Sequence, residues 1–104
     1  MKALVIGYGS IGSLHAKVLK ENNCEVRILS QQKDIPFKTY KSLEEVFKFY
    51  NPNYIIIANK TSNHYETLSH LIKKNYNDKI LIEKPLFNKP EDINFRNLEN
   101  IYIG

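Results

Sequence analysis

The sequence predicts an α/β fold, a single domain in which helices cover both faces of a parallel sheet. Three observations lead to this prediction. Apolar runs of strand length alternate with segments of helical periodicity along the 104 residues. Two of those runs, 54–58 and 79–82, are unbroken, which is typical of central parallel strands. Strands that alternate with helices need crossover connections, and such connections favour a parallel, doubly wound sheet.

The first expected strand covers residues 2–6, and the helix that follows it covers 10–22. The apolar face of this helix is predicted from residues at helical spacing, namely Ile11, Leu14, Val18 and Leu19. Ser42 and Glu45 form a capping box, which predicts the start of the second helix. The other expected elements are strands at 25–29, 37–40, 54–58, 79–82 and 101–103, a helix at 64–74, and a short helix within 88–96.

Glycines with the spacing G-x-G-x-x-G separate the first strand from the first helix. Gly7 permits a tight turn, Gly9 lets the backbone approach phosphates, and Gly12 lets the helix pack closely on the strand. The free N–H groups of the first helical turn, at Ser10 and Ile11, then face an anion. This strand, turn and helix predict a Rossmann-type site for the pyrophosphate of a dinucleotide.

Two further segments are expected beside this turn, because parallel sheets bind ligands beyond the carboxyl ends of their strands. One begins at Ala58 and Asn59 and ends at His64, and the other is 83–85. His64 is expected either to cap or brace the loop or to have a purely structural role. Of the other histidines, His15 is expected to pack or lie on the helix surface, and His70 to face solvent.

The residues after the second strand usually choose between NAD and NADP, because an acid there binds the ribose hydroxyls of NAD. Here the position holds Ser30, and Gln31, Gln32 and Lys33 follow it. Serine with a nearby lysine can accept a 2′-phosphate, so the cofactor is expected to be NAD(P), with NADP favoured. The alternative is that one of the two glutamines serves the ribose of NAD.

Three motifs in order resemble the N-terminal domain of the Gfo/Idh/MocA oxidoreductases, the glucose–fructose oxidoreductase and inositol dehydrogenase family. They are the glycine turn that ends at His15, the segment from Ile56 to His64, and the sequence Glu83-Lys84-Pro85 after a buried strand. The second motif departs from the family, because Asn59-Lys60-Thr61 stands where the family has Thr-Pro-Asn.

The resemblance implies roles for individual residues. The three glycines would contact the pyrophosphate. Lys84 would be the catalytic residue beside the nicotinamide and the substrate hydroxyl. Glu83 would hold the ribose or orient that lysine, and Pro85 would aim it into the cleft.

The resemblance also implies the organisation and the activity of the protein. Residues 1–104 are expected to form the dinucleotide-binding domain, and the substrate domain of the family is expected to be absent from this chain. The whole enzyme would transfer hydride between a nicotinamide and a hydroxyl of a sugar, cyclitol or nucleotide-sugar, while this part alone would be inactive. A homo-oligomer could form through the absent domain. The alternative is a non-catalytic NAD(P)-binding or sensor module.

The composition does not predict a nucleic-acid, membrane or metal partner. The net charge is +4, but the lysines are scattered, which does not predict a nucleic-acid surface. No apolar run is long enough for a membrane span, and no histidine has metal-ligand companions. Cys24 is the single cysteine, which fits a reducing compartment, and the expected location is cytoplasmic.

Overall fold

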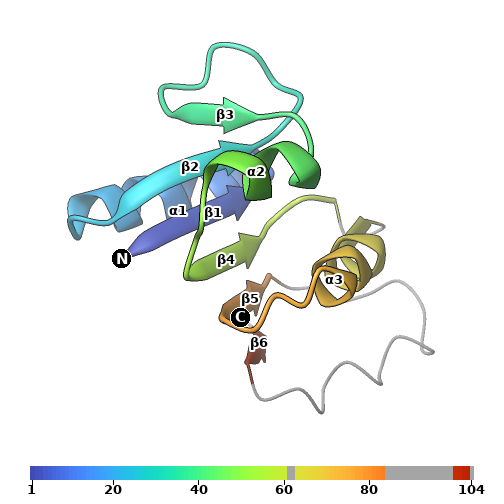
Figure 1. Ribbon diagram of the computed structural model, residues 1–104. Helices are drawn as coiled ribbons and strands as arrows, with labels where there is room; N and C mark the ends of the chain where they lie inside the picture. Colours follow the sequence, from blue (N-terminus) through green and yellow to red (C-terminus); the bar gives the residue numbers. More distant parts are fainter. Residues whose placement is uncertain (61–62, 84–99, 104) are drawn as a thin grey trace.

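The computed structural model describes residues 1–60, 63–83 and 100–103, and helices cover both faces of its six-stranded sheet (Figure 1). The elements in chain order are β1 (Lys2–Ile6), α1 (Ser10–Glu21), β2 (Glu25–Leu29), β3 (Lys38–Tyr40), α2 (Leu43–Phe49), β4 (Tyr54–Ile57), α3 (His64–Lys73), β5 (Lys79–Ile82) and β6 (Ile101–Ile103). The strand order is β3-β2-β1-β4-β5-β6, and every pair is parallel. This is the doubly wound Rossmann order, so the predicted fold class is confirmed.

The alternation of side chains along the strands divides the core into two layers. On the face covered by α2 and α3, the buried residues include Leu4 and Ile6 of β1. The opposite face, covered by α1, receives Val5 of the same strand and Ile28 of β2. Both faces of β1 are therefore buried, which explains why its apolar run is continuous.

The second helix begins where the capping box predicted. Ser42 Oγ accepts a hydrogen bond from the backbone N–H of Glu45 at 3.2 Å. The carboxylate of Glu45 accepts one from the backbone N–H of Lys41 at 2.9 Å. These two bonds satisfy donors at the helix start that have no partner within the helix. They also fix the chain at Lys41, which lies at the cavity described below.

The expected apolar face of α1 was right for Leu19, which packs against the core, and wrong for its other three residues. The side chains of Ile11, Leu14 and Val18 are 48%, 56% and 46% exposed, whereas Gly12 and Ala16 are buried against the sheet. Small residues allow the helix backbone to approach the strands, and the larger residues are then turned outward. Periodicity identified the helix correctly, but a count of large apolar residues could not identify a contact stripe made of small ones.

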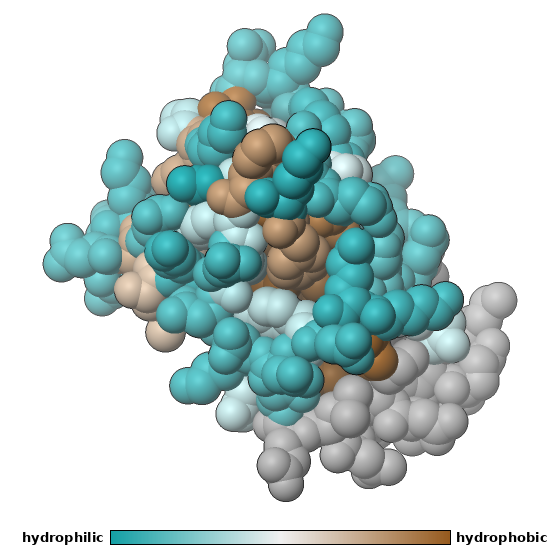
Figure 2. Space-filling model, in the orientation of Figure 1, coloured by the Kyte–Doolittle hydropathy of each residue, from teal (hydrophilic) through white to brown (hydrophobic). Residues whose placement is uncertain are grey.

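On the face shown in Figure 2, hydrophilic side chains form most of the outer surface, and apolar atoms are visible near its centre. No helix among the described residues is long and apolar enough to cross a membrane. The short helix expected within 88–96 lies outside the described residues.

Candidate functional site

The glycine turn after β1 has the close approaches that its spacing predicts. Gly7 has a φ of +99°, and a Cβ atom there would lie 2.8 Å from backbone atoms of Ala58 and Asn59. Its N–H donates to the carbonyl of Leu29 at 2.9 Å. A side chain at Gly7 would therefore be disfavoured both by the backbone conformation and by the neighbouring chain. The turn is held between the carboxyl ends of β2 and β4.

Gly12 and Gly9 have different surroundings. A Cβ atom at Gly12 would lie 2.2 Å from the carbonyl oxygen of Gly7, so the first turn of α1 rests directly on the glycine turn. A Cβ atom at Gly9 would meet nothing within 4 Å, because this residue borders open space. Gly9 is also the N-cap of α1, and no side chain caps the helix there. The first amides of α1 are therefore available to an anion.

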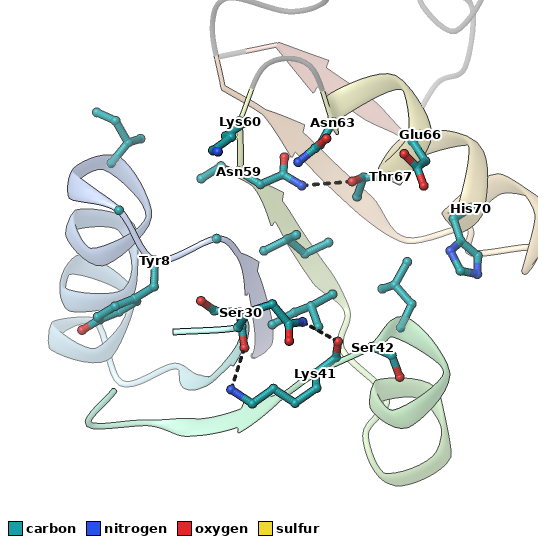
Figure 3. Close-up of a pocket in the computed structure, with 18 of the residues that line it drawn as sticks. Tyr8, Ser30, Lys41, Ser42, Asn59, Lys60, Asn63, Glu66, Thr67 and His70 are labelled. Atoms are coloured by element: carbon teal, nitrogen blue, oxygen red, sulfur yellow. Dashed lines mark hydrogen bonds between the residues drawn. The ribbon is translucent and has the colours of Figure 1, made fainter. Parts of the chain in front are cut away.

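This open space is part of a cavity of about 910 Å³ at the carboxyl ends of β1, β2 and β4 (Figure 3). Predicted site residues that line it are Gly7, Gly9, Ser10, Ile11, Ser30, Ala58 and Asn59. Gly12, Lys33, His64 and Glu83 do not line it. Lys84 and Pro85 lie outside the described residues. The structure thus brings the glycine turn together with the loops after β2 and β4.

Asn59 has both its main chain and its side chain held in place at this cavity. Its amide Nδ2 donates to Thr67 Oγ1 of α3 at 3.0 Å (Figure 3). Its carbonyl oxygen is 2.9 Å from Nε2 of His64, which is 1% exposed and acts as the donor in this contact. The side-chain oxygen Oδ1 is buried and has no hydrogen-bond partner among the described residues.

A buried acceptor without a partner costs about 1–3 kcal/mol. Because Oδ1 has almost no accessible surface, this cost belongs to the loop after β4 and not to the open side of the cavity. The open position at Gly9 and the free helix amides provide for the phosphates of a dinucleotide. The residues present therefore fit a nicotinamide dinucleotide.

Lys41 lines the cavity beside the loop after β2, and sequence reasoning missed it. Its Nζ donates to the carbonyl oxygen of Ser30 at 3.2 Å. A signal was available, because Lys41 directly follows a predicted strand and so lies at a carboxyl end. On the far side of the cavity, Lys60 and Asn63 belong to the predicted segment after β4, whereas Glu66, Thr67 and His70 of α3 were missed.

His70 was expected to face solvent, and its side chain is 41% exposed; it also lies at the rim of the cavity and pairs with an acid. Its Nε2 lies 2.9 Å from the carboxylate of Glu44 at the start of α2. The pKa of Glu44 is below its ordinary value because the carboxylate accepts a hydrogen bond from its own backbone N–H, and His70 adds a favourable charge. This exposed pair connects α2 and α3 at the rim of the cavity.

Glu83 contacts α1 and not the cavity. Its Oε1 lies 2.6 Å from Nε2 of His15, and the side chains of His15 and Glu83 are 26% and 24% exposed. The backbone N–H of Glu83 donates to Ile57 of β4 at 3.1 Å. The last described residue before Lys84 is therefore fixed by its main chain and by its side chain.

No group of three or more histidine, cysteine, aspartate or glutamate side chains suitable for a metal ion occurs within residues 1–60, 63–83 and 100–103. The cavity is lined by apolar side chains at the strand ends together with polar and charged side chains from the surrounding loops and α3. The helix amides at its glycine turn are suited to an anion.

Comparison with known proteins agrees with this site. Residues 1–95 match the family GFO_IDH_MocA, described as an oxidoreductase family with an NAD-binding Rossmann fold. No curated protein matches the sequence. Solved structures do match the fold, and the three described next are 14–23% identical in sequence.

Three dehydrogenases illustrate this similarity. The WlbA (WbpB) dehydrogenase from Thermus thermophilus, in complex with NAD and UDP-GlcNAcA, is 20% identical, with a TM-score of 0.76 over 99% of this chain and 41% of that one. The scyllo-inositol dehydrogenase from Lactobacillus casei, with NAD(H) and scyllo-inositol, is 14% identical, with a TM-score of 0.77 over 100% of this chain and 36% of that one. A probable dehydrogenase from Thermotoga maritima is 23% identical, with a TM-score of 0.82 over 100% of this chain and 36% of that one. The chain thus spans about two fifths or less of their length.

Proposed function

Because the chain belongs to the Gfo/Idh/MocA oxidoreductase family with its NAD-binding Rossmann fold, we propose that it is the cofactor-binding part of a dehydrogenase. The reaction is hydride transfer between a nicotinamide cofactor and a hydroxyl of a sugar, cyclitol or nucleotide-sugar. The observation that carries this proposal is the cavity itself. It combines an uncapped helix N-terminus with an open glycine position at the carboxyl ends of the central strands.

Each part of the cavity corresponds to one part of the dinucleotide. The pyrophosphate would lie on the amides that follow Gly9 at the start of α1, where the helix dipole favours negative charge. The adenosine ribose would lie against Ser30, after β2. The nicotinamide half would extend past Asn59, in the loop after β4.

The sugar-type substrate class is supported by similarity. The solved dehydrogenases of this fold include one bound to UDP-GlcNAcA and one bound to scyllo-inositol. Both ligands present ring hydroxyls, which are the groups that hydride transfer oxidises. The enzyme would complete its substrate site with residues beyond this cavity.

Lys84 is proposed as the catalytic residue. Its neighbour Glu83 is anchored at the carboxyl end of β5, the sheet edge on which the cavity opens. The bound nicotinamide supplies hydride acceptance, and the lysine would hydrogen-bond the reacting hydroxyl and take its proton. A lysine beside a positively charged ring has a lowered pKa, which suits that role.

Binding of the cofactor tests the proposal on the chain as it is. Isothermal titration calorimetry with NADH and with NADPH should show binding, and thermal unfolding should shift upward with ligand. Gly9→Val should abolish both signals, because its side chain would occupy the space reserved for the phosphates. Circular dichroism should show that Gly9→Val is folded, since Gly9 has no neighbour within 4 Å. An absence of heat and of thermal shift with both cofactors at millimolar concentration would refute the proposal.

A further inference from the structure

The end of β3 adds a cation to the adenosine end of the cavity. We propose that Lys41 binds the 2′-phosphate of NADP and thereby selects NADP over NAD, an inference that rests on the proposed cofactor-binding function. Lys41 lies next to Ser30 and Gln31 in the lining of the cavity. This position follows from the sheet order, because β3 is the direct neighbour of β2 and both strands end at the same edge.

Hydrogen bonds hold the side chain of Lys41 across the loop after β2 (Figure 3). Its Nζ donates to the carbonyl oxygens of Ser30 at 3.2 Å and Gln32 at 3.4 Å. In the opposite direction, Gln31 Nε2 donates to the carbonyl of Lys41 at 2.8 Å. The ammonium group is therefore already placed beside the residue that would contact the adenosine ribose, and binding would require little reordering of the side chain.

The charge of this ammonium group is not matched by an acid. Lys41 forms no ion pair within the part of the chain that the structure describes. The carboxylate of Glu45 accepts a hydrogen bond from the main-chain N–H of Lys41 at 2.9 Å and forms no ion pair with its ammonium group. Asp34, the acid in the loop after β2, does not line the cavity. A phosphate dianion would supply the missing negative charge.

The hydrogen-bonding groups at this end also favour a phosphate over a hydroxyl. Ser30 Oγ accepts from the backbone N–H of Gln32 at 3.0 Å, so its own proton is available to donate. Lys41 Nζ is a donor only. The 2′-hydroxyl of NAD is usually bound by a carboxylate acceptor, which this end of the cavity lacks. A 2′-phosphate only accepts, so it is complementary to both groups.

Lys33, which the sequence suggested for this role, is in the same loop but does not line the cavity. It is therefore a matched control, because both lysines are exposed and each substitution by glutamine removes one positive charge. A general effect of net charge would act on the two variants alike. A specific contact would act on Lys41 alone.

The experiment measures dissociation constants for NADPH and NADH with the wild-type chain, Lys41→Gln, Lys41→Arg and Lys33→Gln. The wild type should bind NADPH more tightly. Lys41→Gln should weaken NADPH binding by about ten- to a hundredfold, the range for a charge-assisted hydrogen bond, and change NADH binding by less than about twofold. Lys41→Arg should restore most of the preference, and Lys33→Gln should retain it. Adenosine 2′,5′-bisphosphate and ADP, which lack the nicotinamide half, should show the same effects of the variants as NADPH and NADH, respectively.

The outcomes separate this inference from the proposed function. Equal affinity of the wild type for the two cofactors, or an equal loss in both glutamine variants, overturns the role of Lys41 and leaves cofactor binding intact. Loss of the preference only in Lys33→Gln also overturns it. Failure of the wild type to bind either cofactor overturns the proposed function itself.

Discussion

Gly9 and Gly12 are three residues apart, yet they contribute to different properties of the molecule. A side chain at Gly12 would collide with the carbonyl oxygen of Gly7, whereas one at Gly9 would enter the cavity. Gly12 is therefore needed for the packing of α1, and Gly9 for the space that a ligand occupies. The sequence motif treats both positions alike, and only the surrounding atoms distinguish them.

We expect Gly12→Ala to lower the free energy of unfolding by about 2–3 kcal/mol, because the added methyl group must displace backbone atoms that have no room to move. Urea denaturation followed by circular dichroism measures this change. Gly9→Ala is the control, and it should alter stability by less than about 1 kcal/mol. Similar losses in the two variants would contradict the separation of roles.

Lys84 is predicted to act on the reacting hydroxyl and not on the phosphates. In an enzyme that includes a substrate domain, Lys84→Ala should reduce kcat by about 10²–10⁴-fold, which is typical of a general acid or base. The dissociation constant for the cofactor should stay within about threefold, an order-of-magnitude limit for a group that does not bind phosphate. The two quantities are measured on the same variant. Near-normal turnover, or a selective loss of cofactor affinity, would remove Lys84 from the chemistry.

At the scale of elements, α1 and the end of β5 are connected by one side-chain contact. His15 and Glu83 are separated by 68 residues in sequence and by 2.6 Å in space. The helix whose first amides are proposed to bind the pyrophosphate is thus tied to the strand end that precedes Lys84. A shift of one element would be transmitted to the other through this contact.

A double-mutant cycle should measure this connection. His15→Ala and Glu83→Ala are each expected to destabilise the fold by about 1 kcal/mol, and the coupling energy should be about 0.5–1 kcal/mol because the pair is partly exposed to solvent. Denaturant unfolding of the wild type, the single variants and the double variant gives these values. Additive losses in the double variant would show that the two side chains do not interact.

The sequence predicted the strands well because burial on both faces produces continuous apolar runs, as in β1 and β4. It predicted the glycine turn because the positive φ at Gly7 and the contact at Gly12 restrict both positions to one residue type. The contact face of α1 was wrong for Ile11, Leu14 and Val18, because Gly12 and Ala16 are the residues buried there. Lys41 was missed because its approach to Ser30 depends on the neighbour relation of β2 and β3, which local patterns do not contain.

At the scale of the whole molecule, two tyrosines that follow helices hydrogen-bond to distant parts of the main chain. The hydroxyl of Tyr50 donates to the carbonyl of Ala3 in β1 at 3.1 Å, and that of Tyr76 donates to Pro52 at 3.0 Å. Burial raises the pKa of both phenols above the ordinary value of 10. Both groups are therefore neutral in the folded protein well into the alkaline range.

We expect this shift to make the fold sensitive to high pH. Below pH about 10 both the folded and the unfolded chain keep the phenol protons, so these two groups do not change the free energy of unfolding with pH. Above pH about 10 the unfolded chain releases the phenol protons first, so the free energy of unfolding falls by up to about 1.4 kcal/mol per pH unit for each tyrosine. Urea unfolding between pH 8 and 11 should show a shallower decline for Tyr50→Phe and Tyr76→Phe than for the wild type. Tyr102→Phe, at an exposed ring, should follow the wild type, and identical slopes in all variants would contradict the prediction.

The central place of β1 has a consequence for how the chain folds during synthesis. β1 precedes both of its neighbours in the sequence, and its register pairs Leu4 with Arg27 of β2 on one side and with Ile55 of β4 on the other. A nascent chain therefore leaves one edge of β1 unpaired until β4 leaves the ribosome. Parallel pairing across about fifty residues is slow to form, and an exposed strand edge is a site of aggregation. We expect the chain to be most prone to aggregation during this interval of translation.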